Sequence, residues 1–232
     1  MSKDFVKNNI SFVLPCLNEE TGIKDCILRI QEVIDKSGMS AEIIVVDNGS
    51  IDKSADIAQK MGAKVFFEPK KGYGNAYKKG FDKATGDFII ALDADGTYSP
   101  KDAEKMFLLL LEKDLDFVSG NRLKNINKKS MPAKIVFGNY LFSLVFNILF
   151  FTWISDTQSG VWVFKRKILD DIKLKDGGMG FSSEIKLKVC KKYKFFEYPV
   201  SYSPRYGDKK LNVFKHGLQV LRYFLKQRIE GY

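Results

Sequence analysis

Apolar runs alternate with helix-like segments along the first half of the chain. Five short runs rich in Val, Ile, Leu and Phe each end near a proline or a turn residue, which is typical of buried strands. Apolar residues in the intervening segments repeat at helical spacing. The expected strands are residues 9–15, 41–50, 63–69, 87–96 and 116–122, and the expected helices are residues 21–38, 51–62, 74–86 and 99–114. Repeated strand–helix units predict an α/β fold with a mostly parallel sheet flanked by helices.

Charged residues follow several of the expected strands. In open parallel sheets, ligands bind beyond the carboxyl ends of the strands. Asp47, Asp93, Asp95 and Arg122 all lie at such ends, so the pattern predicts one shared site. Asp93 and Asp95 stand one residue apart in "ALDADGTYSP", and at strand spacing both side chains leave the same face of the sheet. They can therefore converge on one cation.

The second half contains a long apolar segment that carries a polar stripe. Of residues 135–154, 15 of 20 are apolar, which is nearly enough for a membrane span. Asn139, Ser143 and Asn147 recur every four residues and mark one face of a helix. We therefore expect one or two amphipathic helices that lie on a membrane or under a domain, in preference to a spanning helix.

A second amphipathic segment lies near the carboxyl terminus, in "LNVFKHGLQVLRYFLKQR". Its apolar stripe consists of Phe214, Leu218, Leu221 and Leu225. Its polar stripe consists of Lys215, Gln219, Arg222 and Lys226. A basic amphipathic helix can lie on anionic lipid, and an ordinary helix packed on the core with one solvated face shows the same spacing. Both interpretations stay open on the sequence.

The net charge of +10 is concentrated in the second half. Residues 1–120 hold 16 Lys and Arg against 20 Asp and Glu, whereas residues 121–232 hold 22 against 8. A basic half favours an anionic partner, such as nucleic acid, an acidic membrane surface or a phosphorylated substrate, although a lysine-rich solvated surface has the same signature. We do not expect a nucleic-acid partner, because no basic segment is interleaved with aromatic residues.

Composition is typical of an ordered protein of the cytoplasm. Hydrophobic residues make up 45% and aromatic residues 13% of the 232 positions, enough for a sizeable core. The three cysteines are scattered and form no CxxC pair, which favours reduced thiols. The opening "MSKDFVKNN" is polar and contains no apolar segment of the kind found in secretory signals.

The "DADGT" motif has three interpretations: a metal clamp, a phosphatase nucleophile pair, or an acidic turn. Haloacid-dehalogenase-like phosphotransferases carry Asp-x-Asp-Gly-Thr after an apolar strand, and there the first Asp attacks phosphorus. That motif usually opens its domain, and the further acidic pair available here, Asp170 and Asp171, falls in a helix-like segment. The metal clamp is favoured. Carboxylate oxygens suit Mg²⁺ or Mn²⁺, and the single histidine, His216, makes zinc unexpected.

Several segments together carry a family resemblance. They are "VLPCLNEE", "IIVVDNGSIDKS", "KKGYGNAYKKGF", "ALDADGTYSP", "SGNRL", "SDTQSGVWVFKR" and "RYGDKKLN". Over about residues 10–212 the chain resembles glycosyltransferase family 2, and most of all its polyprenyl-phosphate (dolichol-phosphate) hexose synthase branch. The resemblance implies the Rossmann-like GT-A fold in a single domain over residues 1–232. Residues 1–122 would form its nucleotide-binding half and residues 123–232 its acceptor- and membrane-facing half.

The resemblance also implies roles for individual residues. The nucleotide-sugar donor would contact Pro15, Asn18, Glu19, Asp47, Gly49, Ser50, Lys71, Gly72, Asp93, Asp156, Gln158 and Ser159. Asp93 and Asp95 would hold Mg²⁺ or Mn²⁺. The acceptor phosphate would contact Arg122, Lys134, Arg205 and Lys210. Asp95, Arg122 and Arg205 would act in catalysis, joined by Glu184 as general base if the acceptor is a neutral hydroxyl.

The implied reaction is the inverting transfer of a hexose from UDP-glucose or GDP-mannose to a polyprenyl or dolichyl phosphate. It would take place on the cytoplasmic face of an anionic membrane, with the enzyme bound peripherally. "DTQSG" resembles the glucose-specific branch. A sugar, polysaccharide or protein hydroxyl is the alternative acceptor. The chain departs from the family pattern at Asn48, which makes "DNGS" of the usual "DDGS", at Lys134 in place of an arginine, and in "SGVW".

Overall fold

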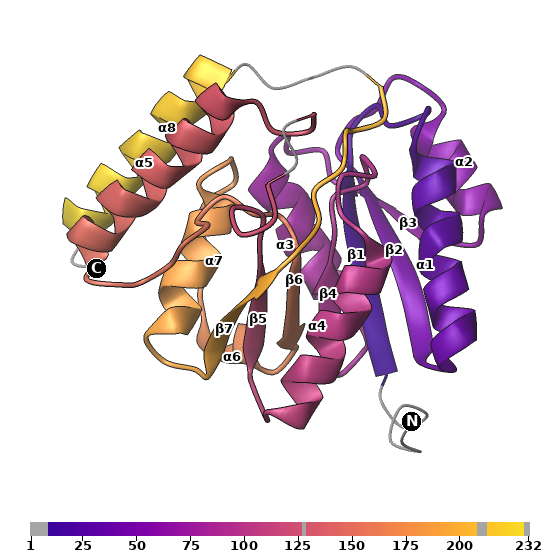
Figure 1. Cartoon of the computed structure of the whole chain (residues 1–232). Coiled ribbons are helices and arrows are strands. Elements are labelled where there is room, and N and C mark those ends of the chain that lie inside the picture. The colour runs from indigo at the N-terminus through magenta and orange to yellow at the C-terminus, as the bar shows by residue number, and fades with distance from the viewer. Residues whose placement is uncertain (1–8, 127–128, 208–212, 230–232) are drawn as a thin grey trace.

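The strands predicted in the first half pair with one another as expected. The computed structural model describes residues 9–126, 129–207 and 213–229, and within them seven strands form one sheet in the order β3-β2-β1-β4-β6-β5-β7 (Figure 1). The strands are β1 (Asn9–Cys16), β2 (Ser40–Asp47), β3 (Lys64–Phe67), β4 (Phe88–Ala91), β5 (Phe117–Asn121), β6 (Trp162–Lys165) and β7 (Phe195–Pro199). β6 is antiparallel to both β4 and β5, and the remaining pairs are parallel. The mostly parallel sheet is therefore confirmed.

Helices cover both faces of this sheet. They are α1 (Ile23–Ser37), α2 (Ser54–Lys60), α3 (Tyr73–Lys83), α4 (Pro100–Glu112), α5 (Ala133–Phe150), α6 (Ile168–Asp171), α7 (Phe181–Cys190) and α8 (Val213–Ile229). One core lies under α1, α2 and α4, and another lies under α3, α6 and α7. Alternation along β1 supplies both cores, because Phe12 and Leu14 enter the first and Val13 enters the second.

Strand direction brings the candidate site to one edge of the sheet. β1, β2, β4 and β5 run the same way, so the loops that follow them lie together. Since β6 runs the opposite way, the loop before it, residues 155–161, reaches this same edge. α6, which contains Asp170 and Asp171, follows β6 and therefore lies at the opposite edge, far from Asp93.

α5 and α8 lie side by side and pack on α7 (Figure 1). Their shared core contains Phe146, Phe150, Leu187 and Phe224. α5 is one continuous helix, and its orientation is now defined: Asn139 and Ser143 of the polar stripe are buried. The apolar side chains Phe137, Tyr140, Leu141, Leu144 and Ile148 are exposed. By length and composition, α5 is the one helix among the described residues that could cross a membrane, and 22% of that window is buried inside the protein.

α8 shows a similar arrangement. Leu218, Leu221 and Leu225 of the predicted apolar stripe are exposed, and the buried face consists of Val220, Tyr223, Phe224 and Gln227. Arg222 and Lys226 are also exposed. The side chains of Phe214 and Lys215 lie outside the described residues. Of the two interpretations left open by the sequence, the one in which the leucine stripe packs on the core is therefore wrong for its described members.

Candidate active site

Asp93 lies in the loop after β4, because that strand ends at Ala91. The expectation that strand spacing directs Asp93 and Asp95 together is therefore wrong, although both stay at the carboxyl end of the strand. The Asp93 Oδ1 atom accepts hydrogen bonds from the hydroxyls of Tyr73, at 3.0 Å, and Tyr77, at 3.2 Å. Burial, and then the charge of Asp95, raise the pKa of Asp93 to about 7, while the two tyrosines oppose the shift.

Asp95 is held by its own turn and faces an arginine. Its Oδ1 accepts hydrogen bonds from the Thr97 backbone N–H at 3.0 Å and the Thr97 hydroxyl at 2.6 Å. Its Oδ2 lies 3.7 Å from Nη1 of Arg205. Arg205 Nη2 in turn donates to Glu19 Oε1 at 2.7 Å. The structure thus brings together three predicted site residues that are distant in sequence.

The segment that carries Arg205 lies against the Asp95 loop. Ser203 N–H donates to the Thr97 carbonyl, and Tyr206 N–H donates to the Asp95 carbonyl, both at 2.9 Å. The Tyr206 ring packs on Gly96, where an added Cβ would lie 2.3 Å from ring atoms. Gly96 therefore allows this segment to approach the candidate metal loop closely.

The loops after β1 and β2 are joined to each other. Asn18 N–H donates to the Ser50 hydroxyl at 2.9 Å, and Asn18 Oδ1 accepts from Ile51 N–H at 2.8 Å. Asp47 Oδ1 accepts from Ser50 N–H at 3.1 Å. Pro15 lies within β1, just before this junction. The first-loop residues implied by the resemblance therefore form one surface with those of the "DNGS" turn.

Asn48, where the chain departs from the family pattern, anchors the loop after β3. Its side-chain NH₂ group donates to the carbonyls of Glu68, at 2.9 Å, and Lys70, at 3.0 Å. Its Oδ1 accepts from Gly72 N–H at 2.7 Å. The exposed Lys71 lies between these contacts, with its stem 3.5 Å from an added Cβ on Gly49. An aspartate could not make the two donations, so Asn48 gives this loop a different support.

Asn48→Asp should lower the free energy of unfolding by about 1–3 kcal/mol, because two part-buried hydrogen bonds are lost and the carbonyls of Glu68 and Lys70 then face a carboxylate. Urea denaturation measures the change. The exposed Asn125→Asp substitution is the matched control and should be neutral. Equal stability of the two variants would show that Asn48 does not anchor the loop.

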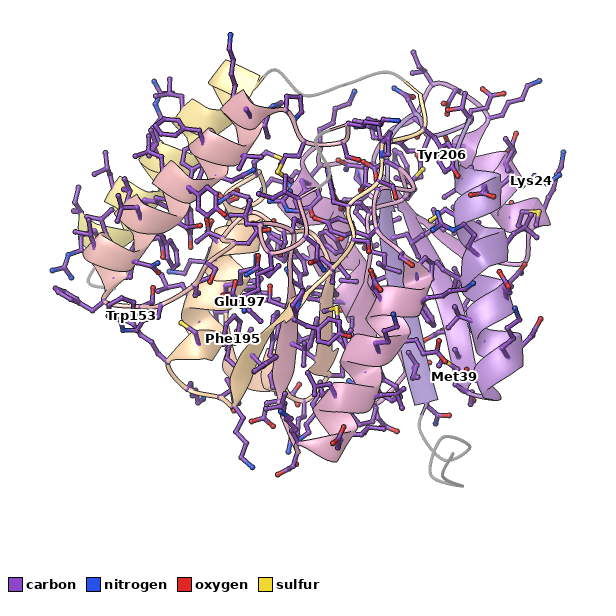
Figure 2. The ribbon with its side chains drawn as sticks, in the orientation of Figure 1. Lys24, Met39, Trp153, Phe195, Glu197 and Tyr206 are labelled. Atoms are coloured by element: carbon purple, nitrogen blue, oxygen red, sulfur yellow. The ribbon has the colours of Figure 1, made fainter. Side chains whose placement is uncertain are left out.

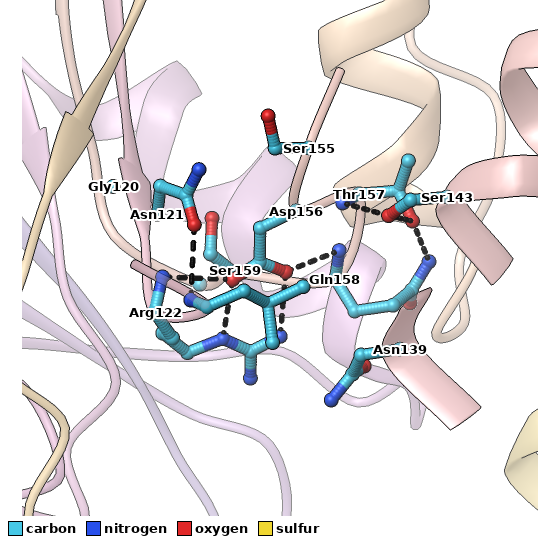
Figure 3. Close-up of polar contacts among 12 residues, drawn as sticks. Gly120, Asn121, Arg122, Asn139, Ser143, Ser155, Asp156, Thr157, Gln158 and Ser159 are labelled. Carbon is cyan, nitrogen blue, oxygen red and sulfur yellow. Dashed lines mark hydrogen bonds and ion pairs between the residues drawn. The ribbon is translucent and has the colours of Figure 1, made fainter. Parts of the chain in front are cut away.

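Arg122 and Asp156 form a buried, two-pronged ion pair (Figure 3). Arg122 Nε and Nη2 donate to the two carboxylate oxygens, both at 2.8 Å, and the Arg122 backbone N–H donates at 3.0 Å. The Arg122 guanidinium also lies 5.4 Å from the centre of the Tyr202 ring. Burial alone would raise the pKa of Asp156, but the charge and hydrogen bonds of Arg122 outweigh it and hold the pKa at about 2.

Asp156 and Ser159 occupy buried positions, which changes the roles implied for them. Both side chains are fully buried, so their functional groups do not face a ligand. Asp156 instead orients Arg122, and the Ser159 hydroxyl lies 3.3 Å from that of Ser119. Gln158 is half-buried and donates to the Ser183 hydroxyl at 2.7 Å. Of these three residues, Gln158 has the most accessible side chain.

The interpretation of Glu184 as a general base does not fit its surroundings. Its carboxylate is fully buried and accepts from the backbone N–H groups of Lys175, at 2.9 and 3.0 Å, and Asp176, at 2.8 Å. It also pairs with Lys188 at 3.0 Å. Glu184 therefore holds the loop before α7, whose Gly177 carbonyl accepts from Asn75 N–H beside Gly72. Its contribution to the site is structural.

The phosphate contacts expected of two lysines stay predictions. Lys134 lies in the first turn of α5 with its side chain exposed. Lys210 lies outside the described residues.

Sequence reasoning missed Lys186, which is fully buried beneath residues 156–159. The residues of α7 from Phe181 to Val189 are all buried, polar and apolar alike, so no spacing in the sequence marks Lys186 as a buried lysine.

The two aspartates fit a divalent cation only in part. Carboxylate oxygens are suitable ligands for Mg²⁺ or Mn²⁺, and Asp95 Oδ2 already faces a cationic group. Among the described residues, no group of three or more His, Cys, Asp and Glu side chains is arranged to hold a metal. Water or the diphosphate of a donor would therefore have to complete the coordination.

Comparison with known families decides the class of protein. The family model described as Glycosyl transferase family 2 matches residues 11–173. The chain belongs to glycosyltransferase family 2. It is therefore a glycosyltransferase, and the haloacid-dehalogenase-like alternative is wrong. The position of Asp170 and Asp171 at the opposite edge of the sheet agrees with this result.

Curated relatives extend the similarity over most of the chain. The low-salt glycan biosynthesis hexosyltransferase Agl6 of Haloferax volcanii is 34% identical over 93% of this chain, which spans 53% of that relative's length. The dolichyl-phosphate hexose transferase of the same organism is 29% identical over 98% of this chain and 97% of its own length. These names support the predicted branch of family 2.

A solved structure confirms the GT-A fold. Glucosyl-3-phosphoglycerate synthase from Mycobacterium tuberculosis, in complex with Mn²⁺, UDP and glucosyl-3-phosphoglycerate, has a TM-score of 0.78. The match covers 95% of this chain and 80% of that chain at 20% identity. A likeness at this level of identity concerns the fold.

Proposed function

We propose that this glycosyltransferase moves a hexose, with inversion, from a UDP- or GDP-sugar to a polyprenyl or dolichyl phosphate. The observation that carries the proposal is the pair of arginines at the carboxyl edge of the sheet. Arg205 lies beside Asp95. Arg122 lies against the ring of Tyr202, which belongs to the same segment of chain as Arg205. Two guanidinium groups beside a candidate metal loop suit a reaction in which both donor and acceptor carry phosphate. The similarity to a dolichyl-phosphate hexose transferase supports the same class of acceptor.

The proposed roles follow from position. The joined loops at Asn18 and Asp47 would hold the nucleotide, with Lys71 beside them. Asp95, assisted by Asp93, would hold Mg²⁺ or Mn²⁺, which would neutralise charge on the departing diphosphate. Arg205 would exchange its contacts with Glu19 and Asp95 for contacts with phosphate.

A phosphate acceptor also agrees with the state of Glu184. A lipid phosphate is already anionic, so it needs orientation and not deprotonation. A neutral hydroxyl acceptor would need a general base, and the candidate suggested for that task is fully engaged with backbone N–H groups and Lys188. This observation favours the lipid phosphate over a sugar, polysaccharide or protein hydroxyl.

A panel of UDP- and GDP-sugars tests the proposal. Nucleotide release is measured with Mg²⁺ or Mn²⁺, with and without a polyprenyl phosphate in detergent. We expect release that requires both the metal and the lipid phosphate, and the active donor identifies the sugar. Release that depends on a hydroxyl acceptor instead would overturn the acceptor class while leaving the family unchanged.

We further propose that α5 and α8 bind the surface of an anionic membrane. The exposed side chains of Phe137 (70% exposed), Ile148 (64%), Phe151 (79%) and Trp153 (95%) lie on or just after α5, and Figure 2 shows Trp153 at the outer end of the helix. Exposed apolar surface of this extent on one helix is typical of membrane or protein contact. The Arg228 guanidinium lies 5.8 Å from the centre of the Phe151 ring, so positive charge borders the apolar surface, as anionic lipid requires.

The inward polar stripe favours a helix that lies on the membrane over one that crosses it. Asn147 Oδ1 accepts from the Thr152 hydroxyl and Ile154 N–H, both at 2.9 Å, and its NH₂ group donates to the Ile154 carbonyl. The Ser143 hydroxyl accepts from Thr157 N–H at 3.3 Å. These contacts attach α5 to the loop that carries Asp156, and a separate spanning helix would lose them.

Leu144→Glu combined with Ile148→Glu should weaken binding to vesicles rich in anionic lipid by about tenfold or more, since each side chain buries apolar surface worth about 1.5–3 kcal/mol. Co-sedimentation measures the binding. The matched control is Leu28→Glu combined with Leu108→Glu, which charges two exposed leucines on α1 and α4. If both double variants bind as the wild type does, α5 is not the membrane contact.

A further inference from the structure

Lys186 places a charged group beneath the turn that precedes β6. Its side chain is fully buried, and its ammonium group donates to the Asp156 carbonyl at 2.6 Å, the Ser159 carbonyl at 3.2 Å and the Ser159 hydroxyl at 2.9 Å. An ammonium group has three hydrogens, and these three acceptors use all of them. Lys186 therefore holds residues 156–159 at both ends.

The acceptors around this ammonium group are neutral oxygens. Two carboxylates and one guanidinium act on it through their charge: Asp156, Glu197 and Arg122. The Asp156 carboxylate is occupied by Arg122 and by the Gln158 N–H, and the Glu197 carboxylate accepts from the N–H groups of Ser155 and Asp156. A buried ammonium group solvated only by neutral oxygens is costly to keep charged.

The opposite side of the same turn faces the candidate metal loop. Gly160 N–H donates to the Tyr98 hydroxyl at 2.7 Å, and the Gly160 carbonyl lies 3.2 Å from the Tyr77 hydroxyl, whose single hydrogen it shares with Asp93. A Cβ added to Gly160 would lie 2.5 Å from Asp93 Oδ2. The turn is thus enclosed between Lys186 and Asp93, and a shift of its backbone would change the contacts of both residues.

We propose that Lys186 is a positioning residue for hexose transfer, whose buried ammonium group sets the shape of residues 156–160 and thereby the placement of Arg122 and Gln158. This inference rests on the proposed function for its effect on turnover, but the shape of the turn can be measured without it.

Protonation changes what Lys186 can hold. Burial lowers its pKa to about 7, with Arg122 acting in the same direction and Asp156 and Glu197 opposing them. The neutral amine has two hydrogens and a lone pair, so it can keep both carbonyls only if the Ser159 hydroxyl reverses and donates to it. That reversal also changes the contact between Ser159 and Ser119. The turn is therefore held most firmly when Lys186 is charged.

The experiment compares wild type with Lys186→Met, which keeps the stem and removes the hydrogen-bond donors. Lys191→Met, at the exposed end of the same helix, is the matched control. The first readout is the backbone amide resonances of residues 156–160, followed from about pH 6 to about pH 9. The second is the pH profile of kcat and of donor KM with a polyprenyl phosphate acceptor. Thermal unfolding verifies that each variant folds.

We expect the amides of residues 156–159 in wild type and Lys191→Met to shift together with a midpoint near neutral pH, and this shift to be absent in Lys186→Met. The Gly160 amide also follows Asp93, which lies beside it with a pKa raised to about 7, and should therefore titrate in every variant. We expect kcat/KM for the donor to fall by about threefold to tenfold as Lys186 loses its proton, and this limb to be absent in Lys186→Met. Amides of residues 156–159 that do not titrate in wild type overturn the proposal, and this result does not depend on whether the variant folds.

Failure of the proposed function and failure of the inference about Lys186 give different results. If wild type transfers no hexose to any lipid phosphate, the proposed function fails, while the amide titration still decides whether Lys186 controls the turn. If wild type transfers hexose and Lys186→Met has the same pH profile and donor KM, the proposed function stands and the role of Lys186 in transfer is rejected.

Discussion

Replacing Asp95 with asparagine should lower the rate of hexose transfer by about 100- to 1,000-fold without unfolding the protein. The amide oxygen can still accept the two hydrogen bonds from Thr97, so the turn is kept. The negative charge that would hold Mg²⁺ or Mn²⁺ against the donor diphosphate is lost. Initial rates at increasing metal concentration measure the effect, and higher metal should restore only part of the rate.

Asp82→Asn is the matched control for this variant. Asp82 lies on α3, is largely exposed and pairs only with its neighbour Lys83 among the ion pairs found in the described residues. It should leave the rate unchanged. An Asp95→Asn protein that transfers hexose at the wild-type rate under saturating metal would remove Asp95 from the reaction and would require another residue to hold the cation.

The largest effect on stability is expected at Asp156. Asp156→Ala leaves the Arg122 guanidinium buried without its partner, and breaking a buried pair in this way costs about 3–5 kcal/mol of unfolding free energy. Denaturant unfolding at neutral pH measures the loss. Transfer should also fall sharply, because Arg122 loses the two hydrogen bonds that orient it.

A double variant separates stability from function. Arg122→Met combined with Asp156→Leu replaces the pair with apolar side chains and should recover most of the lost stability, because it leaves no unpaired charge. It should stay inactive, since the acceptor phosphate has lost its proposed contact. If Asp156→Ala alone costs less than about 1 kcal/mol, the pair is not the structural unit that its geometry indicates.

The same pair predicts the behaviour of the protein in acid. The pKa of Asp156 is about 2 in the folded protein and about 4 in an unfolded chain, so the unfolded chain binds more protons between these values. Its stabilising contribution, about 2–3 kcal/mol, is therefore present above about pH 4 and is lost as the pH falls towards 2. In the double variant, this part of the acid dependence should be absent.

Much of the fold could be predicted from the local spacing of apolar and polar residues. The five strands and four helices expected in the first half all occur, because each depends on the order of apolar and polar residues within a single element. The edge of the sheet that bears the site was predictable for the same reason, since parallel strands place their carboxyl ends together. Asp47, Asp93, Asp95 and Arg122 all lie at that edge or just after it.

The roles of several site residues could not be predicted, because burial and long-range contacts leave no local signal. A glutamate in the first turn of a helix looks accessible, yet Glu184 is enclosed by backbone N–H groups. Lys186 resembles any other lysine of a basic segment until α7 packs against the turn at Asp156. The contact between Arg205 and Glu19 joins opposite ends of the chain.

The sequence by itself thus determined the class of fold, the edge that carries the chemistry and the family. The tertiary structure decided which charged groups face the site and which support it from beneath. It also decided which face of α5 is buried: the polar stripe of Asn139 and Ser143 faces the protein. The period of a stripe specifies that a helix has two faces, and only packing against the loop at Thr157 determines which of them faces the protein.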